Sequence, residues 1–395
     1  MPMRVRLILI LGVLTAFGSL SHDMYLPALP AIAREFSVSA AAAQATLSVF
    51  MLGLAVNQLI VGPLADRVGR SRPLLAGLTI YCLTSIACAL APSIESLWAA
   101  RLVQSVGACA AIVIARAVVR DLYRGADAAH FLSMMMLVFG VAPILGPPLG
   151  AFILDQSSWR GIFWFLAAVS ALAFMAVAFG LPETLPSERR SQHGIAGSLR
   201  AYLTLLGDRR FFAPTLAADA VFAGLFAFIM AGPFVLVELY GLTPQQFGFA
   251  FSANAVGFIL ATQVNARFVR RYGPARMLTA SLVVYFVGAA LLMTNVLAGF
   301  GGLTGILIPI FICFSTVGAA PNNALALATE HYPHAAGSAT ALFGSIQFGV
   351  GAGIGAIMGL LHDGTAFPMA AIILTAAIAA LIINFVLTAR AQPAV

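Results

Sequence analysis

The sequence contains no lysine, and only 9% of its 395 residues carry a charge. A soluble domain typically holds about 25% charged residues, whereas 61% of this chain is hydrophobic. This composition excludes an ordinary soluble enzyme, a disordered chain and a nucleic-acid-binding protein. The 21 basic residues, all arginine, exceed the 14 acidic ones. In so apolar a chain, a basic excess indicates membrane topology before it indicates a polyanionic partner.

Signatures of cofactor, metal or covalent chemistry are also missing. The four cysteines lie inside apolar runs and do not have the spacing of a metal site. There is no Walker loop to indicate ATP binding, and no Ser/His/Asp arrangement with a credible placement. The glycine repeat at Gly349–Gly355 lacks the strand context of a dinucleotide fold, so it indicates helix packing. We therefore expect that the protein is not an enzyme and that it binds no cofactor and no metal.

Apolar runs separated by short polar or Gly/Pro breaks predict twelve membrane-spanning helices, because each span needs about 20 apolar residues. In the N-terminal half they cover residues 7–30, 41–64, 73–91, 96–117, 129–154 and 159–182, and in the C-terminal half 211–236, 245–267, 276–297, 302–325, 336–360 and 367–389. The sequence thus predicts an all-α integral membrane protein. A six-helix lobe at 1–184 is joined to a second lobe at 211–395 by a polar cytoplasmic linker at 185–210.

The arginine positions predict how the chain crosses the membrane. If both termini are cytoplasmic, eighteen of the 21 arginines fall on the inner side. Only Arg34 and Arg160 fall on the outer side, and Arg101 lies within a helix. Cytoplasmic loops are enriched in basic residues, so this distribution favours a multi-pass protein of a bacterial-type inner membrane with both termini in the cytoplasm.

The two predicted lobes carry a weak internal repeat. Aligning Gly69, after the second predicted helix, with Gly273, after the eighth, also aligns Arg67 with Arg271 at an offset of 204 residues. Repeats of this kind are typical of transporters in which two lobes face a central cavity.

Four motifs carry a resemblance to a known family. Gly62–Pro73 resembles the signature between helices 2 and 3 of the major facilitator superfamily, and Arg101–Gly107 resembles its helix-4 motif in proton-coupled members. Gly140–Gly150 resembles the helix-5 motif of its drug exporters, and Asp23–Pro30 the end of helix 1 in its drug/proton antiporters. With Val119–Tyr123, Trp159–Arg160 and Leu181–Thr184, the chain resembles the twelve-helix bicyclomycin-resistance (Bcr/CflA) group.

The resemblance implies the major facilitator fold, with twelve helices in two pseudo-symmetric lobes. It also implies a proton-coupled antiporter that exports small amphipathic, drug-like compounds by alternating access. Its partners would be a small-molecule substrate, protons and the lipid bilayer, with the proton gradient in place of a cofactor and a monomer as the working unit. A dedicated exporter of a native metabolite is the first alternative. A membrane receptor or integral enzyme would need a soluble domain or a nucleophile cluster.

Charges inside the bilayer are costly and mark functional sites. At 1.5 Å per residue, Asp23 lies about 10 Å below the outer helix end at Pro30, and Arg101, six residues after Glu95, lies equally deep. An ion pair or a shared hydrogen-bond network is therefore feasible. In the family the helix-4 arginine is tied to proton coupling, so we expect Asp23 to take up and release the proton and Arg101 to adjust that step. The alternative is a static pair that fixes the first helix to the fourth.

Asp219 is the other buried acid. It lies eight residues after Phe211, about 12 Å from the inner edge, on a predicted helix that offers no basic partner. At the offset of 204 it aligns with Thr15, at a level where some multidrug/proton antiporters of the superfamily carry an acid. We predict a second titratable or cation-binding group that faces the cavity. A structural carboxyl near the lobe interface, either protonated or hydrogen-bonded, is the alternative.

The loop after the second predicted helix resembles a conformational latch. Asp66 has possible partners in Arg70 and in the fourth-helix end around Arg116 and Arg120, and Gly69 permits a tight turn. Charges that pair in only one state bias a two-state equilibrium, whereas a pure topology signal would need neither Asp66 nor Gly69. The C-terminal copy has Arg270 in place of Asp66, so we expect a one-sided latch. Its predicted members are Asp66, Arg67, Gly69, Arg70 and Arg120.

Small and polar residues indicate helix crossings and a cavity. Small residues allow close helix approach and prolines kink helices, so the helix-5 motif is expected to bend against the first or the eighth helix. That motif comprises Gly140, Pro143, Gly146, Pro147 and Gly150. The predicted substrate cavity comprises Tyr25, Asn57, Gln58, Gln104, Phe139, Phe226, Met230, Asn254, Asn322 and Gln347. For each of these residues an interhelical hydrogen bond or simple packing is the alternative.

Overall fold

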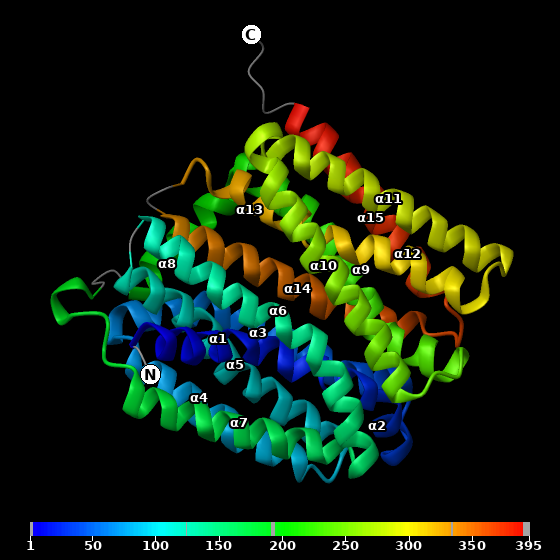
Figure 1. Ribbon diagram of the computed structural model, residues 1–395, viewed down its shortest axis with the longest axis horizontal. Coiled ribbons are helices and arrows are strands. Elements are labelled where there is room, and N and C mark those ends of the chain that lie inside the picture. Colours follow the sequence, from blue (N-terminus) through cyan, green and yellow to red (C-terminus); the bar gives the residue numbers. More distant parts are fainter. Residues whose placement is uncertain (1–2, 124, 191–193, 333–334, 390–395) are drawn as a thin grey trace. The chain divides into compact units, whose positions relative to one another are not determined.

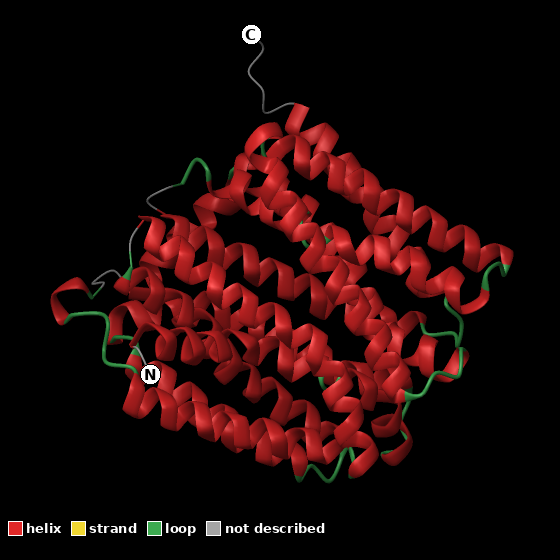
Figure 2. Cartoon of the chain, viewed as in Figure 1, coloured by secondary structure: helices red, strands yellow, loops and turns green. Residues whose placement is uncertain are grey.

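The computed structural model describes residues 3–123, 125–190, 194–332 and 335–389. Within these ranges the regular elements are helices, and no strand occurs (Figure 2). The described chain divides into two compact units, Met1–Ser198 and Leu199–Val395. The division falls inside the predicted linker 185–210, and the order of the helices can be followed in Figure 1.

The first unit is built from seven longer helices and short helical turns. They are α1 (Met3–Asp23), η1 (Leu26–Ala28), α2 (Leu29–Glu35), α3 (Ala40–Val68), α4 (Ser71–Ala89), α5 (Ile94–Leu122), α6 (Gly125–Gln156), α7 (Trp159–Gly180) and η2 (Ser187–Arg189). Helix α8 (Gly194–Gly207) follows at the division between the units. The second unit continues with α9 (Arg209–Pro233), the π-helical η3 (Phe234–Leu239), α10 (Pro244–Tyr272), α11 (Pro274–Ala298), α12 (Gly302–Thr316), α13 (Ala320–Thr329), α14 (Ala336–Leu361) and α15 (Phe367–Ala389).

The apolar helices make this a multi-pass membrane protein. Eleven segments of the described chain are long and apolar enough to cross a membrane. All twelve predicted segments lie in helices of the structure. The fifth, 129–154, lies in α6, whose side chains are described only in part and which is not among the eleven. The count of twelve spans therefore stays a prediction.

Two predicted spans are interrupted rather than continuous. The first is broken between Asp23 and Leu26, and the tenth between Thr316 and Ala320. Proline has no N–H to continue a helix ladder, and Pro27 and Pro321 follow these breaks. The linker also differs from its prediction as a plain polar stretch, because it contains the 14-residue helix α8.

The internal repeat is visible at matching helix ends. Helix α3 is followed by Gly69 with φ +109°, and α10 is followed by Gly273 with φ +77°. Both values require glycine. The same offset of 204 residues relates Tyr81 to Tyr285, which are fully buried in α4 and α11. The repeat therefore extends from the loops into the two cores.

Candidate functional site

A polar network lies inside the first unit around Arg101, whose side chain is fully buried on α5. Arg101 Nη1 donates to Gln104 Oε1 at 2.7 Å, and Nη2 donates to the carbonyl oxygen of Ser21 at 3.1 Å. Gln104 Nε2 donates in turn to Ser85 Oγ at 2.7 Å. The Arg101 guanidinium and the Gln104 amide together thus join three helices, α1, α4 and α5.

Aromatic rings surround the same guanidinium. Its central carbon lies 4.2 Å from the ring centroid of Phe50, 4.9 Å from that of Tyr25 and 5.7 Å from that of Phe163. Among the described residues no carboxylate forms an ion pair with Arg101. The charge is therefore stabilised by neutral acceptors and by the negative faces of the rings.

Asp23 is buried where the first span breaks. Its Oδ1 lies 2.8 Å from Nδ1 of His22, and its Oδ2 has no hydrogen-bond partner among the described residues. The ion pair considered from the sequence is absent, because Arg101 instead binds the carbonyl of Ser21, two residues earlier on α1. Cations are favourable at helix C-termini, so Arg101 holds the helix end that carries Asp23 without neutralising the carboxylate.

The glycines of the helix-5 motif lie against this helix end. A Cβ at Gly146 would lie 3.0 Å from the Cβ of Asp23, and one at Gly150 would collide with the carbonyl oxygen of Met24. Of the two predicted neighbours of this motif, the structure places the end of the first helix against its glycines. Gly140, Pro143 and Pro147 lie in the same helix, and α6 is not interrupted at these prolines.

We expect Gly150→Ala to lower the stability of the protein. The added methyl group would meet backbone rather than a movable side chain, and overpacking of this kind costs about 1–3 kcal/mol. The matched control is Gly353→Ala in α14, where a Cβ meets no atom within 4 Å. The midpoint of thermal unfolding in detergent should fall for Gly150→Ala and stay constant or rise for Gly353→Ala. Equal midpoints would contradict the close approach of α6 to Met24.

Asp219 is a buried carboxyl in the second unit. It lies on α9 and is 2% exposed, and neither of its oxygens has a hydrogen-bond partner among the described residues. A carboxyl without partners is costly to keep ionised in an apolar region, whereas uptake of a proton or approach of a cation relieves that cost. The arrangement is compatible with the predicted titratable or cation-binding role and with a protonated structural acid, whereas the hydrogen bonds of a hydrogen-bonded structural acid are absent among the described residues.

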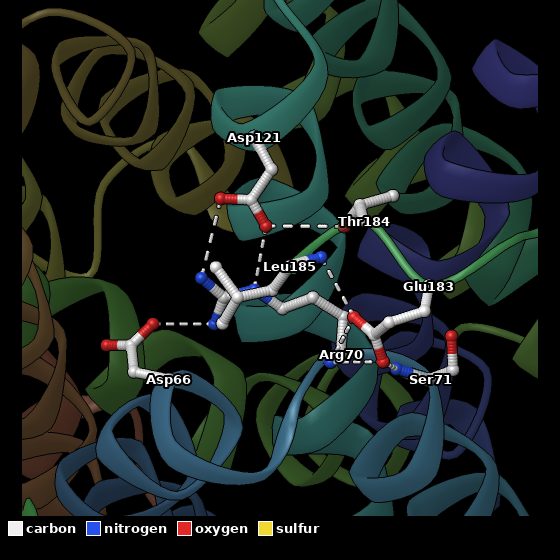
Figure 3. Close-up of polar contacts among 7 residues, drawn as sticks. All are labelled: Asp66, Arg70, Ser71, Asp121, Glu183, Thr184 and Leu185. Atoms are coloured by element: carbon white, nitrogen blue, oxygen red, sulfur yellow. Dashed lines mark hydrogen bonds and ion pairs between the residues drawn. The ribbon is translucent and has the colours of Figure 1, made fainter. Parts of the chain in front are cut away.

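The predicted latch is an interaction network centred on Arg70, which lies between α3 and α4 (Figure 3). Arg70 Nη1 forms an ion pair with Asp66 Oδ1 at 2.6 Å, and Nε forms one with Asp121 Oδ2 at 2.8 Å. Of the partners considered for Asp66, the structure therefore shows Arg70 rather than Arg116 or Arg120, and Arg70 in turn reaches Asp121 at the end of α5. The hydrogen bonds to these carboxylates raise the pKa of Arg70 above its usual range, although burial acts to lower it.

Glu183 completes this network, which we call the Arg70 cluster (Asp66, Arg70, Asp121 and Glu183). The Glu183 carboxylate accepts from the backbone N–H of Arg70 at 2.9 Å, of Ser71 at 3.1 Å and of Leu185 at 3.0 Å (Figure 3). Burial acts to raise the pKa of Glu183, but these N–H donors and the charge of Arg190 lower it overall. Because the pKa of Glu183 is depressed, its contribution to the stability of the folded protein is complete at neutral pH. That contribution is lost as the pH falls through the lowered pKa.

Two predicted latch members lie outside this network. Arg67 and Arg120 are exposed and form no hydrogen bond or ion pair with other described side chains. Asp121 and Glu183 were missed as members. The structure explains the place of Glu183, because α4 starts without a capping side chain of its own. Such a helix start needs an acceptor from elsewhere.

We expect Gly69→Ala to impair the protein more than Gly273→Ala. Both glycines have positive φ, so alanine costs about 1–3 kcal/mol at either site. Only at Gly69 would the new Cβ also lie 2.6 Å from Oε2 of Glu183, whereas at Gly273 nothing lies within 4 Å. Hydrogen exchange at the amide of Ser71 should accelerate in Gly69→Ala alone. The same exchange rate in both variants would contradict the role given to Glu183.

The predicted cavity residues of the first unit mostly join helices. Tyr25 and Gln104 belong to the surroundings of Arg101, and the Tyr25 hydroxyl donates to Thr46 Oγ1 at 2.9 Å. Asn57 Nδ2 donates to the carbonyl of Gly53 at 2.7 Å and to Ser105 Oγ at 3.5 Å. Gln58 is buried. The side chain of Phe139 lies outside the described residues.

In the second unit the predicted cavity residues lie on four helices, α9, α10, α13 and α14. Phe226 stacks on Phe222 with ring centroids 6.1 Å apart, and Met230 is buried. Asn254 and Asn322 donate to carbonyls one turn earlier on the chain. Gln347 is half-buried on α14. The substrate cavity as a whole therefore stays a prediction.

Known proteins are similar to this chain over nearly its whole length. The sequence model of the Major Facilitator Superfamily matches residues 11–356 and 220–393. An MFS-type transporter of Bacillus subtilis is 35% identical over 98% of this chain and 96% of its own. A bicyclomycin resistance protein homolog of Haemophilus influenzae is 34% identical over 92% of this chain and 91% of its own. The crystal structure of a nucleoside transporter superimposes with a TM-score of 0.74 at 14% identity, covering all of both chains.

Proposed function

Because the chain belongs to the Major Facilitator Superfamily of membrane transporters, we propose that it is a proton-coupled antiporter that exports small amphipathic, drug-like compounds. The observation that carries the proton coupling is Asp23, a buried carboxyl with one oxygen unpartnered at the break of the first span. The similarity to a bicyclomycin resistance protein homolog supports a drug-like substrate.

In the proposed cycle, protonation of Asp23 from the outer side releases the substrate outward. Loss of that proton to the cytoplasm then prepares the transporter for the next substrate. Arg101 keeps the end of α1 in place during both steps, because it binds the carbonyl of Ser21 rather than the carboxylate. The Arg70 cluster favours one of the two states, since its ion pairs have no copy at Gly273 and Arg270 of the second unit.

The remaining parts of the proposal follow from the apolar chain and its arginines. The protein works in a bacterial-type inner membrane with both termini in the cytoplasm, as the inner-side excess of arginine favours. It acts as a monomer, without a cofactor, and uses the proton gradient as its energy source. A dedicated exporter of one native metabolite is the second candidate, because a buried carboxyl can couple proton movement to the export of a drug or of a metabolite.

Transport in inverted membrane vesicles tests the substrate class. An imposed pH gradient should drive uptake of chemically different probes, such as ethidium as a cationic dye and bicyclomycin as a neutral drug. Vesicles without the protein and vesicles treated with a protonophore are the controls. Uptake confined to one compound from a panel of amino acids, sugars and nucleosides would replace the drug exporter with the dedicated exporter. Uptake that ignores the protonophore would contradict proton coupling.

We expect Asp219→Asn to reduce gradient-driven uptake of ethidium more than that of bicyclomycin. A cation is drawn to the buried carboxylate, whereas a neutral drug gains little from its charge. The measurement compares initial uptake rates of both probes at several pH values. Unchanged rates for both would show that Asp219 is structural, and equal losses for both would assign it to proton transfer instead.

A further inference from the structure

Helix α8 (Gly194–Gly207) exposes a row of leucines although it lies outside the candidate membrane spans. Leu199, Leu203 and Leu206 are 55%, 63% and 42% exposed. Their spacing of four and three residues places them on one face of the helix. Tyr202 and Leu205, on the adjoining face, are 5% and 2% exposed and hold the helix against the protein.

Unpaired positive charges accompany this leucine row. Arg200 lies at its border on the helix wheel, and Arg209, the first residue of α9, follows α8 after Asp208; both arginines are exposed. Among the described residues neither guanidinium forms a hydrogen bond or ion pair. The nearby carboxylate of Asp208 is already occupied, because it accepts from the Tyr332 hydroxyl and from the backbone N–H of Arg210. Both arginines are therefore available to an external anion.

The position of α8 along the chain places its end next to a membrane span. Only Asp208 separates α8 from the span that begins at Arg209, so the end of α8 lies at the boundary of the bilayer. A helix with an apolar face bordered by arginine at such a boundary has the pattern of an interfacial helix. Neither a soluble ligand nor a second protein is needed to cover the leucines.

We propose that α8 lies in the membrane interface and binds anionic phospholipid. The leucine row enters the boundary between headgroups and acyl chains, and Arg200 and Arg209 bind lipid phosphates. Each basic residue close to an anionic surface contributes about 1 kcal/mol, which corresponds to about a fivefold change in partition. This inference needs only the membrane-embedded protein and is independent of the transported substrate.

Hydrogen exchange of the amides from Leu199 to Gly207 tests this directly. The full chain is placed in nanodiscs of phosphatidylcholine alone or mixed with phosphatidylglycerol. We expect slower exchange in the mixed discs, and about a fivefold loss of that protection for Arg200→Gln and again for Arg209→Gln. Arg276→Gln, which removes an exposed arginine at the start of α11, is the control and should change nothing in α8.

Two further arms separate lipid binding from its alternatives. Leu199→Gln with Leu203→Gln should reduce protection in both disc types, and inorganic phosphate added to detergent micelles should give none. Equal exchange in the two disc types, or the same effect from Arg276→Gln as from Arg200→Gln, would overturn the proposal. Protection by inorganic phosphate alone would also overturn it. Unchanged exchange in α10 to α15 confirms that each variant is folded.

Discussion

Replacing Asp23 by asparagine should reduce uptake driven by a pH gradient to the level of vesicles that lack the protein. Asparagine fills nearly the same volume at the break of the first span, so it keeps the packing against Gly146. It cannot take up or release a proton, and this is the step that couples the gradient to transport. Exchange of labelled for unlabelled substrate without a gradient needs no net proton movement and should survive.

The matched control is Asp155→Asn. Asp155 is an exposed acid at the end of α6, and its replacement removes the same charge without touching the buried carboxyl. Uptake by this variant should equal that of the wild type. If Asp23→Asn still concentrates substrate against a pH gradient, the proton site lies elsewhere. If it also loses exchange without a gradient, Asp23 acts in substrate binding or folding.

Replacing Arg101 by methionine should cause the largest loss of stability among single substitutions in the first unit. Gln104 Oε1 and the carbonyl of Ser21 would both lose their donor in a buried setting. Each buried acceptor left without a partner costs about 1–3 kcal/mol. The end of α1 would also lose the group that holds it, so gradient-driven uptake should fall together with the thermal midpoint in detergent.

Arg101→Lys and Arg276→Met make this test specific. Lysine keeps the charge but lacks the planar fork that reaches two acceptors, so an intermediate midpoint and partial uptake are expected. Arg276 is exposed, and its replacement should leave both quantities unchanged. A stable Arg101→Met variant with full uptake would contradict the positioning role of Arg101.

Much of this arrangement could be predicted from the sequence because the bilayer constrains the chain in one dimension. Apolar length and arginine placement predict where helices cross and at what depth Asp23 and Arg101 lie. Depth does not give rotation about a helix axis, however. The sequence therefore left open whether Arg101 meets the carboxylate of Asp23, and the structure shows it at the carbonyl of Ser21.

The Arg70 cluster illustrates the same limit. The pairing of Asp66 with Arg70 follows from their spacing of four residues at the helix end. Glu183 lies 113 residues from Arg70 in the chain, and only the packing of α7 beside α4 brings its carboxylate to the start of α4. The leucines of α8 have helical spacing in the sequence. The polar residues around them, however, led us to predict a plain polar linker without a helix.

The internal repeat allows equivalent residues of the two units to be compared, and their polar contacts differ. At the offset of 204 residues, Arg101 aligns with Gly305, and Ser21 aligns with Leu225. In the first unit the Tyr81 hydroxyl forms a hydrogen bond with Ser21, whereas the buried Tyr285 hydroxyl has no partner among the described residues. The polar network around Arg101 is thus confined to the first unit, as are the ion pairs of the Arg70 cluster.

Proton release on substrate binding is the most direct test of Asp23 as the proton-coupling carboxyl. The purified protein is kept in weakly buffered detergent with a pH-sensitive dye, and the compound with the strongest gradient-driven uptake is added. We expect the wild type to release protons on binding and Asp23→Asn to bind the compound without releasing any. Binding to the wild type without proton release, or equal release from Asp23→Asn, would contradict this role of Asp23.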